Sequence, residues 1–130
     1  MNDVSIATAA GADQLQWSEF LTRAGGADIF HDWRWGEVIE AAYGHRPAHL
    51  IARRGGAVVG VLPLIDVRSP LLGRSLISTA FTVGGGIVAD DQSVARALCD
   101  AACDAGRARR ANYVELRNNA FPCGDGWIEK

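Results

Sequence analysis

Residues 48–69 read AHLIARRGGAVVGVLPLIDVRS, two aliphatic runs joined by a Gly-Gly pair at 55–56. Two consecutive glycines supply the positive φ angles that a type I′ turn requires, so this stretch predicts an antiparallel β-hairpin. With a tight turn and regular strands, Leu50 falls opposite Val61.

The second run of the hairpin carries apolar side chains on both of its expected faces. One face holds Val58, Gly60, Leu62 and Leu64, and the other holds Val59, Val61 and Ile65. Because a half-solvated strand would alternate apolar and polar residues, this run predicts a strand covered by helices on both sides. Gly60 and Pro63 both weaken a strand ladder, so we expect a bulge or a splay between them.

A turn at 69–73 leads into a third predicted strand, residues 74–83. Leu71 and Leu72 stand at this turn, where polar residues are usual. An apolar turn tip is typical of a contact surface. Its occupant could be a further half of the protein, a partner protein or the surface of a membrane.

Two short helices are expected before the hairpin and one longer helix after it. Asp13, Asp32 and the pair at 90–91 stand at N-cap positions, and Gly44 follows the second helix. We expect the second helix to bury Trp35, Val38, Ile39 and Ala42. Residues 113–117 alternate as a strand, which a helical crossover would place parallel to its neighbour. The predicted fold is α/β, with a mixed sheet flanked by helices.

Composition limits the class of protein. The 130 residues suffice for one domain. A net charge of −2 argues against a strong general affinity for nucleic acid or anionic membrane, so no DNA partner is expected. Cys99 and Cys103 lie one helical turn apart, where a bridge is sterically poor, and the chain start has no secretory signal pattern. The expected location is therefore the reducing cytoplasm.

Gly84, Gly85 and Gly86 precede the third helix and could hold a phosphate group of a cofactor. The run lacks the spacing of the known phosphate-binding fingerprints and has no basic residue close to it in the sequence. A close-packed structural turn is the alternative interpretation.

Trp35 and His45 are candidate substrate-binding residues. A tryptophan near a helix start could equally belong to the core, and a histidine after a helix-ending glycine could equally serve the loop. The three histidines show no metal-ligand spacing, so no metal site is predicted.

An ordered series of short motifs runs from residue 17 to residue 117: W..FL, then H.WRWGEVIEAAYGHRPAHLIARRGGAVVGVLPLIDVRSPLLGRSLIS, then VGGGIV and YVELR. This series resembles the FemAB-like family, and more narrowly the FemAB-related proteins that accompany exosortase and exopolysaccharide systems. The residues that carry the resemblance are Trp17, Trp35, Gly44, His45, Gly60, Val61, Leu62, Pro63, Leu64, Ser69, Gly73, Ser78, Gly85, Gly86, Glu115, Leu116 and Arg117.

The resemblance implies the GNAT (acyl-CoA N-acyltransferase) fold, of which FemAB-type proteins carry two units in tandem. It also implies acyl-CoA or aminoacyl-tRNA as a possible donor, with a cell-envelope precursor as acceptor. GNAT enzymes that use acetyl-CoA hold its pyrophosphate with a Q/R-x-x-G-x-G/A loop at the third helix, and TVGGGIVADD here lacks the Gln or Arg. No catalytic residue of the family maps onto this chain.

Residues 1–130 are accordingly predicted to form a single N-terminal GNAT-like unit, incomplete by comparison with the family. We expect an open sheet edge near 113–117 that a second GNAT-like half or a partner protein would cover. Two functions stay open. The chain is either the front part of an acyl- or aminoacyltransferase, inactive alone, or a non-catalytic binding or scaffolding domain.

Overall fold

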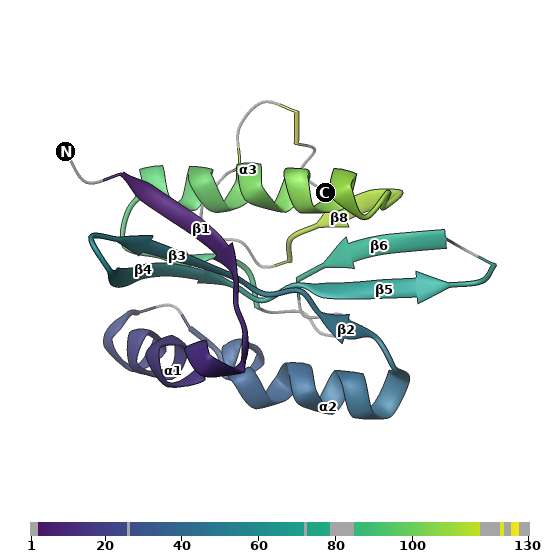
Figure 1. Ribbon diagram of the computed structural model, residues 1–130, viewed down its shortest axis with the longest axis horizontal. Coiled ribbons are helices and arrows are strands. Elements are labelled where there is room, and N and C mark those ends of the chain that lie inside the picture. Colours follow the sequence, from purple (N-terminus) through teal and green to yellow (C-terminus); the bar gives the residue numbers. More distant parts are fainter. Residues whose placement is uncertain are drawn as a thin grey trace.

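The hairpin predicted around residues 55–56 forms the centre of a layered structure (Figure 1). The computed structural model describes residues 3–25, 27–71, 73–78, 85–117, 123, 126 and 127. Its helices are α1 (Gln14–Arg23), α2 (Trp33–Tyr43) and α3 (Gln92–Ala108), with short 3-10 turns η1 (Gly11–Asp13) and η2 (Ile29–His31). Its strands are β1 (Val4–Thr8), β2 (Arg46–Pro47), β3 (Leu50–Arg54), β4 (Ala57–Leu62), β5 (Ile65–Ser69), β6 (Gly73–Ile77), β7 (Val88–Ala89) and β8 (Tyr113–Glu115).

The β3–β4 hairpin turns at two glycines with φ angles of 59° and 85°, which confirms the predicted turn. Its register differs from the prediction, since Leu50 pairs with Leu62 and not with Val61. The register shifts by one residue between Ala52 and Arg53, where Val59 is the extra residue on β4. This β-bulge confirms that the ladder is irregular close to Gly60.

The bulge also changes which side chains of β4 share a face. Val58 and Val61 pack together with α1, whereas Val59 and Leu62 pack together with α3. The faces expected from strict alternation were therefore wrong after Val58, because the extra residue turns the strand by one position. The prediction that both faces are buried is confirmed, since Val59 is 8% exposed and Leu62 is fully buried.

Two four-stranded sheets replace the single sheet that was expected. Sheet A has the strand order β1-β3-β4-β7, and sheet B has the order β2-β5-β6-β8. The predicted second strand divides at Pro63 and Leu64, so that β4 lies in sheet A and β5 continues into sheet B. Proline has no N–H to donate to a ladder, which accounts for the break.

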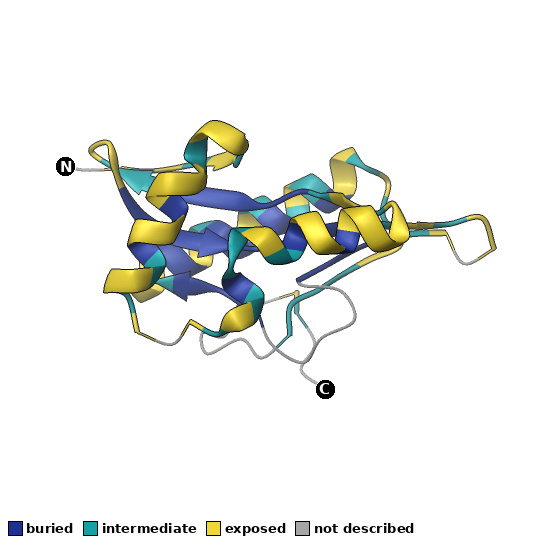
Figure 2. Ribbon diagram, turned by 90° about the horizontal axis from the view of Figure 1, so that it is seen from below, coloured by how far each residue is buried: buried dark blue, intermediate teal, exposed yellow. Residues whose placement is uncertain are grey.

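Helices cover both faces of the sheets, with α3 on one side and α1 and α2 on the other (Figure 1). Trp17 and Phe20 of α1 are buried against Ile51 of β3 and Val61 of β4. Figure 2 shows buried strands between helices whose outer surfaces are exposed.

The predicted caps of α2 form, whereas the side chain of Asp13 makes no cap bond to α1 and accepts the backbone N–H of Ala10 at 2.8 Å instead. One predicted helix face also differs. The Asp32 side chain accepts the backbone N–H of Arg34 at 2.9 Å, and Gly44 closes α2 with a φ of 74°. Val38, however, is 52% exposed, and Ala42 is exposed as well. The predicted stripe was wrong there, because α2 covers the short strand β2 and turns mainly Ile39, Gly36 and part of Trp35 toward the sheet.

The last described strand, β8, is parallel to β6, as the crossover predicted. It is shorter than the expected 113–117, and most of the third predicted strand beyond Ile77 lies outside the described residues.

A disulfide joins Cys99 of α3 to Cys123, while Cys103 is a free thiol. The absence of a Cys99–Cys103 bridge agrees with the spacing argument, but the bridge to Cys123 was not foreseen. Disulfides are uncommon in reducing compartments, so this bridge weighs against the cytoplasmic expectation. Among the helices that the structure describes, none is both long and apolar enough to span a membrane.

Candidate functional site

The N-terminus of α3 is where the family resemblance would place a pyrophosphate of a CoA donor. Asp91 is the N-cap of this helix, and its Oδ1 accepts the backbone N–H of Val94 at 3.0 Å. The same oxygen accepts the hydroxyl of Ser93 at 2.7 Å. A carboxylate of the chain thus already occupies a position that an anionic ligand would need.

Two arginines from distant parts of the chain neutralise the aspartates at this helix start. Arg54, at the end of β3, places Nη1 3.1 Å from Oδ2 of Asp91. Arg23, at the end of α1, places Nη1 3.2 Å from Oδ1 of Asp90 and also donates to the backbone oxygen of Val58. The sequence shows no basic residue next to the glycine run, but the fold brings two arginines to the helix that follows it.

These contacts favour the charged form of Asp91. The backbone N–H of Val94, the Ser93 hydroxyl and the Arg54 guanidinium lower the pKa of Asp91 to about 2. The carboxylate is therefore ionised at neutral pH, and it would repel a phosphate at the N-terminus of α3.

The glycine run lies away from the start of α3, because β7 stands between them. Gly85 and Gly86 are buried, and Gly85 has a φ of 90°. The N–H of Gly85 donates to Oδ2 of Asp28 at 3.3 Å, and the oxygen of Gly86 accepts Nε2 of His31 at 2.7 Å. These contacts match the structural-turn interpretation, whereas Gly84 lies outside the described residues.

His31 is buried and belongs to a polar cluster at η2. Its Nδ1 lies 3.0 Å from Oδ1 of Asp28, and its backbone oxygen accepts the indole N–H of Trp17 at 2.8 Å. Asp32, the neighbour of His31 in the sequence, caps α2 as predicted and is not the partner of this histidine. The cluster fastens η2 to the glycine run.

Trp35 and His45 lie at opposite ends of α2. Trp35 packs edge-on against Phe30 at a centroid distance of 5.2 Å and contacts the small core around Ile39. Its indole N–H is buried and has no hydrogen-bond partner among the residues that the structure describes. His45 stacks on Tyr43, and its Nδ1 accepts the backbone N–H of Arg68 at 3.4 Å. The structure does not bring the two residues into one site, and ligand binding by either stays a prediction.

Metal-ligating side chains do not converge within the described part of the chain: no group of three or more His, Cys, Asp or Glu there could hold a metal ion.

No family model matches this chain, and no curated protein matches its sequence. Solved structures do match the fold. A ribosomal-protein-alanine N-acetyltransferase from Brucella melitensis biovar Abortus 2308 is similar over 98% of this chain and 98% of its own, at 17% identity and a TM-score of 0.61.

An aminoglycoside N-acetyltransferase in complex with CoA is similar over 100% of this chain and 95% of its own, at 15% identity and a TM-score of 0.62. A GNAT family acetyltransferase from Staphylococcus aureus is similar over 100% and 98%, at 11% identity and a TM-score of 0.57.

The fold is the GNAT fold. This confirms the predicted fold class, while the low identities leave the FemAB-like and exosortase-related part of the resemblance without support from these comparisons.

Proposed function

We propose that this GNAT-like unit is the front part of a FemAB-like acyl- or aminoacyltransferase that acts on a cell-envelope precursor, and that the unit is inactive alone. The sequence resemblance supports the family and the substrate class. The fold shared with several N-acetyltransferases supports acyl transfer as the general chemistry.

The observation that carries the transferase proposal is the shared GNAT fold, and the occupied N-terminus of α3 supports the part in which the unit is inactive alone. A CoA pyrophosphate would need free N–H donors and a positive field there, but Asp91 takes the N–H of Val94 and the charges of Arg54 and Arg23 are matched by two aspartates. In this proposal the unit positions a substrate or a second unit, and the acyl donor binds elsewhere. An aminoacyl-tRNA is compatible with such a donor site, since it needs no pyrophosphate site on α3.

The alternative is a non-catalytic GNAT-like binding or scaffolding domain, and the same occupied helix terminus favours it. The cytoplasmic location stays part of the proposal in either case, although the Cys99–Cys123 bridge weighs against it. The DNA downstream of the Lys130 codon distinguishes the two, because an in-frame second GNAT-like unit belongs only to the transferase.

A calorimetric titration with acetyl-CoA tests whether α3 accepts the cofactor. We expect no binding below millimolar concentrations, because an ionised carboxylate stands where the pyrophosphate would lie. A low-micromolar dissociation constant, on the order of −8 kcal/mol, would contradict the proposal.

Replacing both aspartates with serine (Asp90→Ser with Asp91→Ser) keeps a capping hydroxyl but removes two negative charges. This variant should bind acetyl-CoA more tightly than the wild-type chain. Asp104→Ser is the matched control, since it removes an exposed carboxylate near the far end of the same helix. The control should behave like the wild-type chain.

A further inference from the structure

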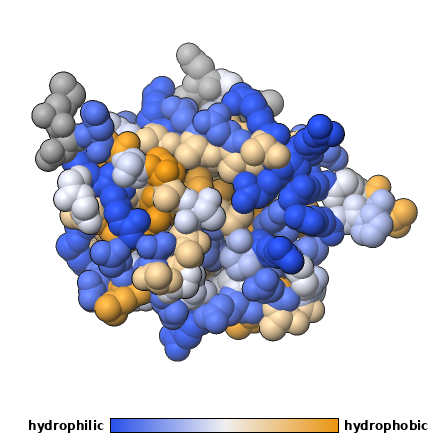
Figure 3. All heavy atoms as spheres, in the orientation of Figure 1, coloured by the Kyte–Doolittle hydropathy of each residue, from blue (hydrophilic) through white to orange (hydrophobic). Residues whose placement is uncertain are grey.

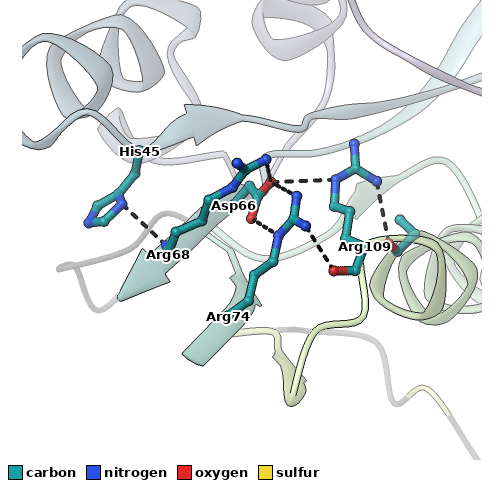
Figure 4. A network of polar contacts seen from close by, with 6 residues as sticks. His45, Asp66, Arg68, Arg74 and Arg109 are labelled. Carbon is teal, nitrogen blue, oxygen red and sulfur yellow. Dashed lines mark hydrogen bonds and ion pairs between the residues drawn. The ribbon is translucent and has the colours of Figure 1, made fainter. Parts of the chain in front are cut away.

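A cluster of arginines surrounds one buried carboxylate on β5 of sheet B (Figure 4). Asp66 of β5 is 4% exposed. Its carboxylate is bound by two guanidinium nitrogens of Arg74, with Nε 2.9 Å from Oδ1 and Nη2 2.7 Å from Oδ2. Arg68 reaches Oδ2 at 3.4 Å, and Arg109 lies 3.8 Å from the same oxygen.

The cluster holds more positive charge than its carboxylate needs. Arg74 alone forms a bidentate pair with Asp66, the strongest arrangement for a guanidinium and a carboxylate. Hydrogen bonds from Arg74 outweigh burial and lower the pKa of Asp66, so the carboxylate is charged at neutral pH. Three guanidinium groups on one carboxylate leave an excess of two positive charges.

Arg68 has only a weak partner within the described part of the chain. Arg68 and Arg74 are directly opposite each other on β5 and β6, an arrangement of like charges that destabilises a sheet. The Arg68 side chain is 61% exposed, and its only contact with a carboxylate among the described residues is the long one to Asp66. Its guanidinium therefore keeps donors for an anion outside the protein.

An apolar tip projects beyond these arginines. The turn between β5 and β6 extends from the body of the molecule in both ribbon views (Figures 1 and 2). Leu71 on this turn is 94% exposed, the highest value among the large hydrophobic residues described. Figure 3 shows the hydrophobic tip next to a strongly hydrophilic surface where the hairpin leaves the body.

An exposed leucine beyond a group of arginines fits the surface of a bilayer that contains anionic lipids. The acyl region accepts the leucine, and the headgroup phosphates accept the arginines. A dissolved phosphate or a nucleic acid would use the arginines but would leave Leu71 in water. The chain as a whole carries a net charge of −2, so its overall charge would not by itself attract it to an anionic surface.

We propose that the β5–β6 hairpin docks the protein on anionic membrane surfaces, with Leu71 inserted among the lipids and Arg68 and Arg109 bound to headgroup phosphates. Arg74 stays with Asp66, whose carboxylate also contacts the other two arginines. This docking surface does not depend on the proposed function, because it involves neither α3's N-terminus nor acyl transfer.

The test is flotation of the chain with phosphatidylcholine vesicles, with and without phosphatidylglycerol. We expect binding only when the anionic lipid is present, with a loss of binding as salt is added. Arg68→Gln and Arg109→Gln should each lower the partition constant roughly five-fold, and Leu71→Ser should lower it on the order of ten-fold. Leu71→Trp should raise it, because tryptophan favours the interface.

Matched controls lie elsewhere on the surface. Arg34 on α2 is 78% exposed, and Leu15 on α1 is 70% exposed. Arg34→Gln and Leu15→Ser should leave the partition constant unchanged. All substitutions spare Arg74, so Asp66 keeps its partner, and circular dichroism confirms that each variant is folded.

Three outcomes would overturn the proposal. The first is the absence of binding to anionic vesicles. The second is binding that the control variants weaken as much as the hairpin variants do. The third is binding of inorganic phosphate or RNA through Arg68 and Arg109 with no effect of Leu71→Ser, which would identify a site for dissolved anions.

Discussion

His49 occupies an environment that keeps its side chain neutral. The ring is enclosed by Trp17 and Trp33, with centroid distances of 5.2 and 5.4 Å. Its Nδ1 accepts the backbone N–H of Leu64 at 3.0 Å, next to the break between β4 and β5. Burial lowers the pKa of His49 from 6.5 to about 4. Protonation of the imidazole therefore opposes the folded state.

The free energy of unfolding should decrease as the pH falls from 6.5 to 4, because the unfolded chain binds a proton at His49 that the folded chain excludes. The expected loss is on the order of 3 kcal/mol. Urea unfolding at several pH values measures it. The carboxylates whose pKa values are shifted titrate below this pH range, because the folded structure lowers those pKa values from 3.8.

The His49→Asn variant retains an acceptor for the N–H of Leu64 but does not titrate in this range. Its free energy of unfolding should be nearly constant between pH 6.5 and 4.5. His45→Asn is the matched control and should keep the wild-type slope. An unchanged slope in His49→Asn would show that another group causes the pH dependence.

At the scale of elements, the contact between α3 and sheet A depends on the lack of a side chain at Gly60. A Cβ atom there would lie 2.6 Å from Cγ1 of Val94 and 3.0 Å from Cδ1 of Leu98. The helix approaches the bulged part of β4 closely because this position is a glycine.

Gly60→Ala should therefore lower the free energy of unfolding by about 1–3 kcal/mol, since Val94 and Leu98 must move to admit the methyl group. Chemical denaturation of the wild-type chain and the variant measures this loss. Gly25→Ala is the control, because a Cβ atom at Gly25 would meet nothing within 4 Å. A Gly60→Ala chain as stable as the wild type would mean that α3 can shift away from the sheet at no cost.

Turns and most helix ends were predictable, because their signals are local. The glycine pair at 55–56, the N-caps Asp32 and Asp91 and the C-cap Gly44 each act on residues within one turn, and all were found where the sequence placed them. The register of β3 with β4 could not be predicted, because one bulged residue moves every later pair and its position depends on packing against α3.

The candidate site was less predictable, because its contacts join residues far apart in sequence. Arg54 and Asp91 are 37 residues apart, and His31 and Gly86 are 55 apart. Cys123 lies in a stretch without periodicity, so nothing in the sequence indicated its bridge to Cys99. The arginines around Asp66 come from three elements and show no common motif.

At the scale of the whole molecule, sheet B ends in a short strand. The edge strand β8 pairs with β6 over three residues, and Tyr113 on it is 54% exposed. Exposed strand edges pair with other strands when these are available. Near this edge, a shallow pocket of about 390 Å³ is lined by residues that include Cys103, Asn112 and Trp127.

We expect the isolated chain to self-associate through this edge at concentrations of tens of micromolar. Light scattering coupled to gel filtration measures the mass. Tyr113→Lys, which places a charge on the edge strand, should reduce the association. Leu15→Ser, on α1, removes an exposed apolar side chain elsewhere and should not. A monodisperse monomer would favour the binding-module alternative over the transferase fragment.

The break at Pro63 and Leu64 separates the β5–β6 hairpin of sheet B from the strands of sheet A. Sheet A lies between two apolar clusters, whereas β5 contributes Ile65 and part of Val67 to the small cluster with Ile39. Since no continuous strand ladder joins β4 to β5, we expect the outer part of the hairpin, beyond Leu76 of the main cluster, to open before the centre of the fold. Amide hydrogens of β5 and the first half of β6 should exchange with deuterium well before those of β3 and β4. The hairpin that we propose to dock on membranes would then move while sheet A stays rigid.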